Sequence, residues 1–169
     1  MRVRPATLAL VSLVVGIAVV SLVLIKERPN DPANEKRVNQ TESVTDNGMN
    51  VTVYKSSSCN CCGNYVAYLK RRGLNVETVN TQDLSGIKSA NGVPRDVQSC
   101  HTTLIGDYTV EGHVPIEAIE KLLNERPPIE GIALPDMPAG SPGMPGAKQG
   151  PFDIRGFTAD GTLSSFMLL

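Results

Sequence analysis

The sequence predicts an α/β domain: a small mixed sheet with helices on its faces. Strand-like and helix-like segments alternate in the order strand, helix, strand, helix, and two strands and a helix follow. Three cysteines stand within four positions where the first strand meets the first helix. The 169 residues are 41% hydrophobic and 4% aromatic, which predicts one domain with a core of Val, Ile and Leu. The formal net charge of −1 gives no indication of a nucleic-acid partner.

Residues 1–28 are predicted to form an N-terminal transmembrane helix that anchors the chain. Residues 6–25 carry no charge, and about 20 apolar residues span a bilayer. A cleaved signal peptide is the alternative, but its apolar region would be shorter and would end at a small-residue cleavage site. The short tail before this run, with Arg2 and Arg4, favours a folded domain outside the cytoplasmic membrane. In a bacterium this compartment is the periplasm.

The polar residues 29–48 predict a flexible linker, and residues 49–169 the folded domain. Val51–Tyr54 alternates as a strand does. Helical spacing of apolar residues from Cys62 to Leu69 then predicts a helix that ends at Gly73. Leu74–Val79 predicts a second strand, parallel to the first in a βαβ unit.

Short helices are expected over residues 83–90, opened by Thr81 or Asp83, and over residues 93–98. The Gly106-Asp107 pair between two strand-like segments predicts a hairpin.

Pro115 is expected to open a helix with one apolar face. Residues 131–150, rich in Pro, Gly and Met, predict a loop without regular structure, and residues 152–168 a terminal hairpin.

This order is that of a thioredoxin-like or glutaredoxin-like domain, in which a Cys-x-x-Cys pair stands at the end of the first strand and the start of the first helix. Cys59 and Cys62 have this spacing. A helix start lowers the pKa of a thiol, so one interpretation is a thiol–disulfide oxidoreductase with Cys59 as nucleophile and Cys62 as resolving thiol. Another is a structural disulfide, with Cys100 as a buried apolar filler.

Cys61 favours a metal site instead. Adjacent helical residues point about 100° apart, so Cys61 and Cys62 are poorly placed to chelate one ion. Diverging thiolates can bridge several ions, and thiolate selects soft Cu(I). Four thiolates would balance the charge of four Cu(I) ions. The sequence therefore predicts a thiolate-bridged Cu(I) cluster.

Cys100 is the expected fourth ligand, because the start of the strand at residue 102 lies beside the Cys-x-x-Cys pair in a thioredoxin-like sheet. A cis-proline usually occupies that place, and residues 100–103 contain no proline. His101 would point away from Cys100 in an extended chain, which predicts a surface or core histidine. A structural Cys3His zinc site is a weaker alternative, because its paired knuckle spacings are absent.

His113 lies just before a predicted helix start, where a capping or turn role is expected and a ligand role is a minority hypothesis. Met137 and Met144 stand in the Pro/Gly segment. Their thioethers are either soft ligands for Cu(I) or apolar clamps that fold the segment onto the domain.

Residues 50–168 resemble the CopG-type periplasmic copper-resistance proteins. The matching segments are Val53-Tyr54-Lys55-Ser56, Cys59-Asn60-Cys61-Cys62-Gly63, Ser99-Cys100-His101-Thr102, Val110-Glu111-Gly112-His113-Val114-Pro115, Gly131-Ile132-Ala133-Leu134-Pro135, Met137-Pro138 and Gly140-Ser141-Pro142-Gly143-Met144. Two features depart from the family: Asn60 stands where a glycine is usual, and the N-terminus has the pattern of a retained anchor.

The resemblance implies a thioredoxin-like fold that binds copper through Cys59, Cys61, Cys62 and Cys100, with Met137, Met144 and His113 as accessory groups. The expectation is thus a copper-resistance protein tethered to the inner membrane, with its folded domain in the periplasm. It would sequester Cu(I), exchange electrons with it, or pass it to an exporter or another copper-handling protein. Whether the chain is an enzyme stays open.

Overall fold

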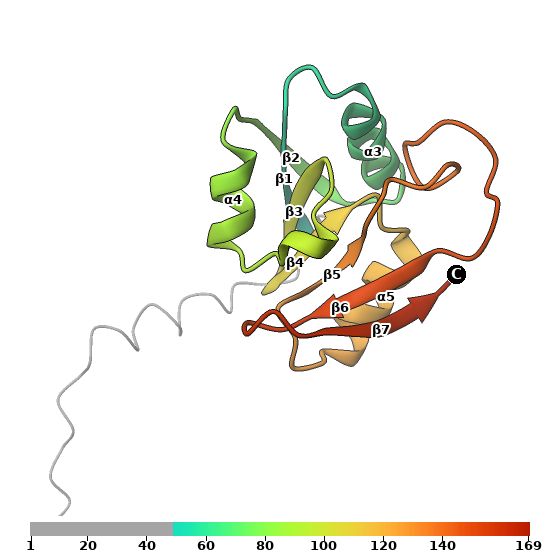
Figure 1. The fold of residues 1–169 in the computed structure, drawn as a ribbon. Helices are drawn as coiled ribbons and strands as arrows, with labels where there is room; N and C mark the ends of the chain where they lie inside the picture. Colours follow the sequence, from blue (N-terminus) through green and yellow to red (C-terminus); the bar gives the residue numbers. More distant parts are fainter. Residues whose placement is uncertain (1–48) are drawn as a thin grey trace, which may run out of the picture. The chain divides into compact units, whose positions relative to one another are not determined.

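The computed structural model describes residues 49–169, which form a seven-stranded mixed sheet with three α-helices (Figure 1). The strand order is β2-β1-β3-β4-β5-β6-β7. The elements are β1 (Asn50–Lys55), α3 (Asn60–Arg71), β2 (Asn75–Asn80), α4 (Leu84–Ala90), the 3-10 helix η1 (Arg95–Val97), β3 (His101–Ile105), β4 (Tyr108–Gly112), α5 (Ile116–Glu125), β5 (Gly131–Leu134), β6 (Asp153–Phe157) and β7 (Leu163–Leu168).

The predicted βαβ unit and both hairpins are confirmed. β1 and β2 are parallel, with Val51 opposite Val76, and α3 connects them. β3 and β4 pair as an antiparallel hairpin around Gly106-Asp107, and β6 and β7 form the terminal hairpin. The first short helix begins after Asp83, whose side chain accepts a hydrogen bond from the Gly86 N–H group at 2.8 Å. This contact satisfies one of the free donors of a helix start.

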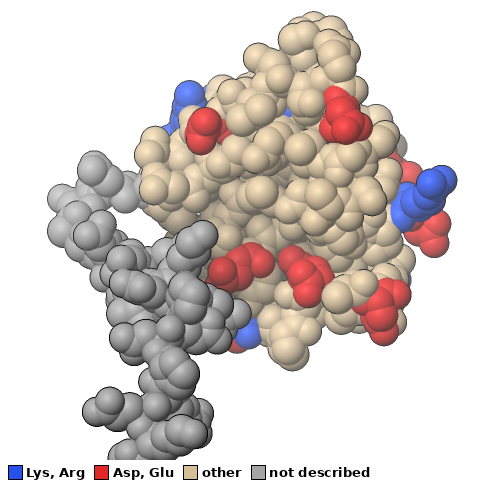
Figure 2. Space-filling model, turned by 90° about the vertical axis from the view of Figure 1, so that its left-hand side faces the viewer, with Lys and Arg blue, Asp and Glu red and all other residues tan. Residues whose placement is uncertain are grey.

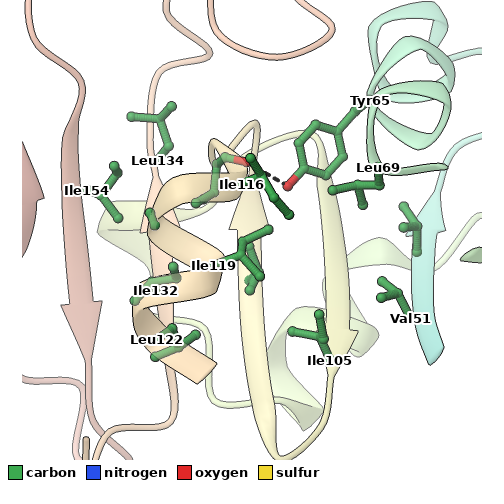
Figure 3. Packing of buried hydrophobic residues seen from close by; sticks show 14 of the residues in the cluster. Val51, Tyr65, Leu69, Ile105, Ile116, Ile119, Leu122, Ile132, Leu134 and Ile154 are labelled. Atoms are coloured by element: carbon green, nitrogen blue, oxygen red, sulfur yellow. Dashed lines mark hydrogen bonds between the residues drawn. The ribbon is translucent and has the colours of Figure 1, made fainter. Parts of the chain in front are cut away.

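The main hydrophobic core lies between the sheet and the helices α3 and α5 (Figure 3). Leu69 from α3 and Ile119 and Leu122 from α5 are almost wholly buried there. They pack with strand residues such as Ile105 and Ile132, on alternate positions that share one face of the sheet. The hydroxyl of buried Tyr65 donates a hydrogen bond to the Val114 carbonyl at 2.9 Å, drawn as a dashed line in Figure 3. This bond ties α3 to the segment that precedes α5.

The opposite face of the sheet is covered by α4 and η1, and Figure 1 shows α4 across β1 and β3 from α3. Its apolar cluster is small: Val93, Val97, Ala133 and Phe157 are buried there. Charged side chains are buried on this face as well, a feature that the sequence analysis did not predict.

The expectation of irregular structure throughout residues 131–150 is wrong at its start. Gly131–Leu134 forms β5, parallel to β4 and antiparallel to β6. Every residue of this strand is buried, so it lies inside the sheet and covers both faces with apolar atoms. The segment has no alternation because neither face is exposed, and its four residues were obscured by the Pro and Gly residues that follow. The irregular part begins after Leu134.

No helix within residues 49–169 is long and apolar enough to cross a membrane. The anchor predicted at residues 1–28 and the linker at residues 29–48 lie outside the described residues. On the face of the molecule in Figure 2, Lys and Arg side chains do not gather into a basic patch.

Candidate metal centre

The start of α3 collects three of the four cysteines. Cys59 is the N-cap residue, and its sulfur accepts a hydrogen bond from the backbone N–H of Cys62 at 3.3 Å. Cys59 and Cys62 form a disulfide, with their Cα atoms 5.3 Å apart. Cys61 is free, and its sulfur lies 3.5 Å from that of Cys59. The pair with Cys-x-x-Cys spacing is thus oxidised in this structure, and the free Cys61 thiol lies beside it.

Cys100 comes from the other side of the site, directly before β3, and it is also a free thiol. Its backbone carbonyl oxygen lies 3.7 Å from the sulfur of Cys62. The four cysteine sulfurs all lie within 4.8 Å of one another. The structure therefore brings together the four cysteines that the sequence analysis selected, although Cys100 is 38 residues away from Cys62. Their role as metal ligands stays a prediction.

Two histidines lie beside Cys100. His101 is a buried core histidine, one of the two predicted placements, but the expectation that it points away from Cys100 is wrong. Its Nδ1 atom lies 3.4 Å from the Cys100 sulfur, on the same side instead of the opposite one. Cys100 precedes the first residue of β3, so the strict alternation of a strand does not reach it. The Nε2 atom of His113 lies 3.1 Å from the same sulfur. Cys100, His101 and His113 thus form a second group of ligand-type atoms within 4.8 Å that shares Cys100 with the first.

The carbonyl of Pro142 sets the orientation of His113. It lies 2.7 Å from Nδ1, which places the ring proton on Nδ1 because a carbonyl only accepts hydrogen bonds. The lone pair of Nε2 then points to the Cys100 sulfur, the arrangement of a ready metal ligand. Gly112, with φ of 78°, makes this turn of the chain feasible, since a Cβ atom there would lie 2.7 Å from Ser99.

The Pro/Gly segment closes over the start of α3 at Gly143. A Cβ atom on Gly143 would lie 2.7 Å from the backbone nitrogen of Tyr65 and 2.8 Å from the carbonyl oxygen of Cys61. The Asn64 side chain donates a hydrogen bond to the Gly143 carbonyl at 3.4 Å. Only glycine permits so close an approach, so this loop is held against the helix that carries the cysteines.

The two candidate methionines are placed differently. Met144 is partly buried and lines an open cavity together with Cys61 and Asn64. Met137 is 40% exposed and does not line this cavity. Met144 is therefore the methionine that the structure brings to the cysteine site.

Burial sets the protonation of the groups around Cys100. It raises the pKa of the Cys100 thiol to about 11, and the nearby Cys61 thiol adds to the rise. Burial also lowers the pKa of His113, and lowers that of His101 well below its usual value, with a further contribution from His113. The lowered pKa values favour the neutral imidazoles, in which one ring nitrogen has a lone pair that can bind a metal ion.

Sequence reasoning missed His101 as a member of the site. It also missed a buried polar network behind Cys100, in which the carboxylate of Glu111 contacts Lys88, Ser99 and Thr102. A lysine at the end of one short helix and a glutamate within an apolar strand were the available signals, but nothing in their spacing links them.

The region that contains these residues is similar to known proteins. A family model described as "Protein of unknown function, DUF411" matches residues 97–144, which include Cys100, both histidines and both loop methionines. Two solved structures, "Copper resistance protein copG- Form 1" and "Copper resistance protein copG- Form 2", each share 37% sequence identity with this chain. Each match covers 72% of this chain and 98% of the other, with a TM-score of 0.67. No curated protein sequence matches.

Proposed function

Because this chain belongs to the family of copper resistance protein CopG, we propose that it binds Cu(I) through a thiolate-bridged cluster and acts in copper resistance. The observation that carries the proposal is the convergence of four sulfurs within 4.8 Å, with two imidazoles beside one of them. Thiolate and imidazole donors in this number suit a soft copper ion better than a hard cation.

In this proposal Cys59, Cys61, Cys62 and Cys100 hold the copper. His113 and Met144 are the accessory ligands that the geometry favours, and Met137 is the least favoured. Full binding requires two electrons, because reduction of the Cys59–Cys62 disulfide must release two of the four thiolates. The oxidised chain offers Cys61 and Cys100 alone as thiol ligands.

The thioredoxin-like classification is part of the proposal. It is supported by the position of Cys59 between β1 and α3, and by the order β2-β1-β3-β4 with parallel β1 and β2 and an antiparallel β3–β4 hairpin. The tether at residues 1–28 and the periplasmic location complete it. Cell fractionation that recovers the full chain in a soluble fraction would contradict the tether.

The cluster is tested by reducing the protein anaerobically, titrating it with Cu(I) and measuring bound copper per chain by metal analysis. More than one tightly bound copper per chain is expected, and the number should fall in Cys61→Ser and in Cys100→Ser. Fewer than one copper per chain, or binding unchanged in Cys61→Ser, would refute a bridged cluster.

A second candidate function is thiol–disulfide exchange, which the Cys59–Cys62 disulfide favours. An incoming dithiol would attack Cys59, displace the Cys62 thiolate and leave as a disulfide, so that two electrons pass to the protein. Cys59 is partly exposed and Cys62 is fully buried, in keeping with these roles. Disulfide reductase turnover that survives in the metal-free Cys61→Ser, Cys100→Ser double variant would favour this function over the cluster.

A further inference from the structure

The buried network on the α4 face lies directly behind Cys100. The Glu111 side chain comes from β4, where it stands opposite Thr102 of β3. One carboxylate oxygen, Oε1, accepts hydrogen bonds from the Lys88 ammonium at 2.5 Å and from the Ser99 backbone N–H at 2.6 Å. The other, Oε2, accepts from the Thr102 hydroxyl at 2.7 Å.

These contacts bracket Cys100. The 3-10 helix η1 ends at Val97 and β3 begins at His101, so residues 98–100 belong to no regular element. The Ser99 N–H group, just before Cys100, is bonded to the carboxylate, as is the Thr102 hydroxyl, two residues after it. The Glu111 carboxylate is thus bonded on both sides of the cysteine, to the backbone of Ser99 and to the side chain of Thr102.

The stability of the fold does not explain this pair. Glu111 is 0% and Lys88 is 5% exposed, so both charges are removed from water. A well-packed apolar pair of similar volume would stabilise such a site as well or better, because no charge would need to be desolvated. The network does supply direction, because three donors converge on one carboxylate: Lys88 from α4, Ser99 from the segment before β3, and Thr102 from β3.

We propose that Glu111 is a positioning residue for Cys100, with Lys88 as its counter-charge, and that it holds the Cys100 sulfur toward the other three cysteines. Glu111 touches no sulfur itself. It acts from the opposite face of the sheet through the Ser99 N–H group, in the way that outer partners of metal ligands set ligand orientation. The effect of Glu111 on copper binding rests on the proposed function. Its effect on the position of the Cys100 sulfur does not depend on copper.

Two double variants test the side chain at position 111 as a hydrogen-bond partner of the Ser99 N–H group and the Thr102 hydroxyl. Lys88→Met, Glu111→Gln removes both charges and keeps an acceptor for the Ser99 N–H group. Lys88→Met, Glu111→Met removes the same charges and the acceptor as well. The matched control is Lys121→Met, Glu125→Met, which removes the exposed Lys121–Glu125 pair of α5.

The first measurement uses no metal. In the oxidised protein Cys61 and Cys100 are the free thiols, with sulfurs within 4.8 Å, so the reagent dibromobimane should bridge them. We expect the bridging rate of the acceptor-free variant to fall at least about fivefold, while the glutamine variant and the α5 control stay within about twofold of the unmodified protein. Equal bridging rates in the Glu111→Gln and Glu111→Met double variants, under conditions where circular dichroism shows both folded, would overturn the proposal.

The second measurement is Cu(I) affinity of the reduced proteins, by competition with bicinchoninate. Loss of an outer partner of a metal ligand typically costs about 10–100-fold in affinity, so a loss of at least about tenfold is expected between the glutamine and methionine variants. The difference should vanish when Cys100→Ser is added to both, because the effect acts through that sulfur. A difference that persists without Cys100 would show a merely structural role. Absent copper binding in the unmodified protein would refute the copper function, and the bridging result would still decide the positioning role.

Discussion

The face of the sheet beneath α3 and α5 and the face beneath α4 are held by different interactions. On the first face, residues such as Leu69, Ile119 and Leu122 form a continuous apolar core. On the second face, a small apolar cluster lies beside the Lys88–Glu111 ion pair and its hydrogen bonds. Both faces meet at the segment that carries Cys100, which has histidines on one side and the carboxylate network on the other.

This difference determines how each face should respond to mutation. Apolar packing is non-directional and scales with buried area, so its loss should be graded. A buried polar network is satisfied only when every member is present, so the removal of one member leaves the others unpaired in a low dielectric. The α4 face should therefore tolerate single substitutions poorly and matched double substitutions well.

The largest effect is expected from Lys88→Met. The substitution leaves the fully buried Glu111 carboxylate without its counter-charge, and breaking such a pair costs about 3–5 kcal/mol in the free energy of unfolding. Urea denaturation of the oxidised, metal-free protein measures it. Adding Glu111→Gln should recover most of the loss. A cost below about 1 kcal/mol for the single variant would mean that the pair is not held as a buried network.

Leu122→Ala sharpens the comparison from the other face. Leu122 is 0% exposed in the main core, and truncation of such a leucine costs about 2–5 kcal/mol, depending on how far the cavity collapses. The volume-conserving Leu122→Met should cost less than about 1.5 kcal/mol in the same urea experiment. If Leu122→Met is as costly as Leu122→Ala, the response of this face is not graded by lost volume.

A smaller effect is expected from acid. The pKa values of His101 and His113 are lowered in the folded state, so the unfolded chain binds protons more readily below its own histidine pKa of about 6.5. Their contribution to stability is therefore complete above pH 6.5 and is lost as the pH falls, by at most about 1.4 kcal/mol per pH unit for each histidine.

The free energy of unfolding at a series of pH values from 7.5 to about 5 tests this dependence. His101→Phe, which keeps a ring against Tyr65, should have a shallower profile than the unmodified protein. Parallel profiles would show that His101 is not buried in its neutral form.

Most of the fold was predictable because its signals are local. The hairpin turn at Gly106-Asp107, the apolar face of α5 and the end of α3 just before Gly73 are all encoded within a few residues. β5 was missed because a four-residue strand buried on both faces has no periodicity of its own. It becomes a strand only because β4 and β6 provide partners on both sides.

The candidate site likewise has a part that could be predicted from the sequence and a part that could not. The convergence of Cys100 with the other cysteines was predicted from an expected sheet order. The structure brings it about by antiparallel pairing of β1 and β3, which sets the start of β3 beside the end of β1. The orientation of His101 toward Cys100 could not be predicted, because the backbone between η1 and β3 follows no regular period. The Lys88–Glu111 pair was equally hidden, because it joins α4 to β4 through a register that only the complete sheet defines.

The smallest effect is expected for the exposed pair of α5. Lys121 and Glu125 are also a lysine and a glutamate in contact at 2.5 Å, but their side chains are 32% and 56% exposed. Water screens the charges and the side chains lose rotamer freedom when they pair, so Lys121→Met, Glu125→Gln should change the free energy of unfolding by less than about 0.5 kcal/mol. Addition of 1 M salt should remove even this difference, whereas the cost of Lys88→Met should persist because buried charges are screened far less. The two ion pairs have the same contact distance but are expected to differ widely in their effect on the free energy of unfolding, and the salt dependence of that effect distinguishes them. Similar costs for the two pairs would mean that solvent exposure does not control their strength.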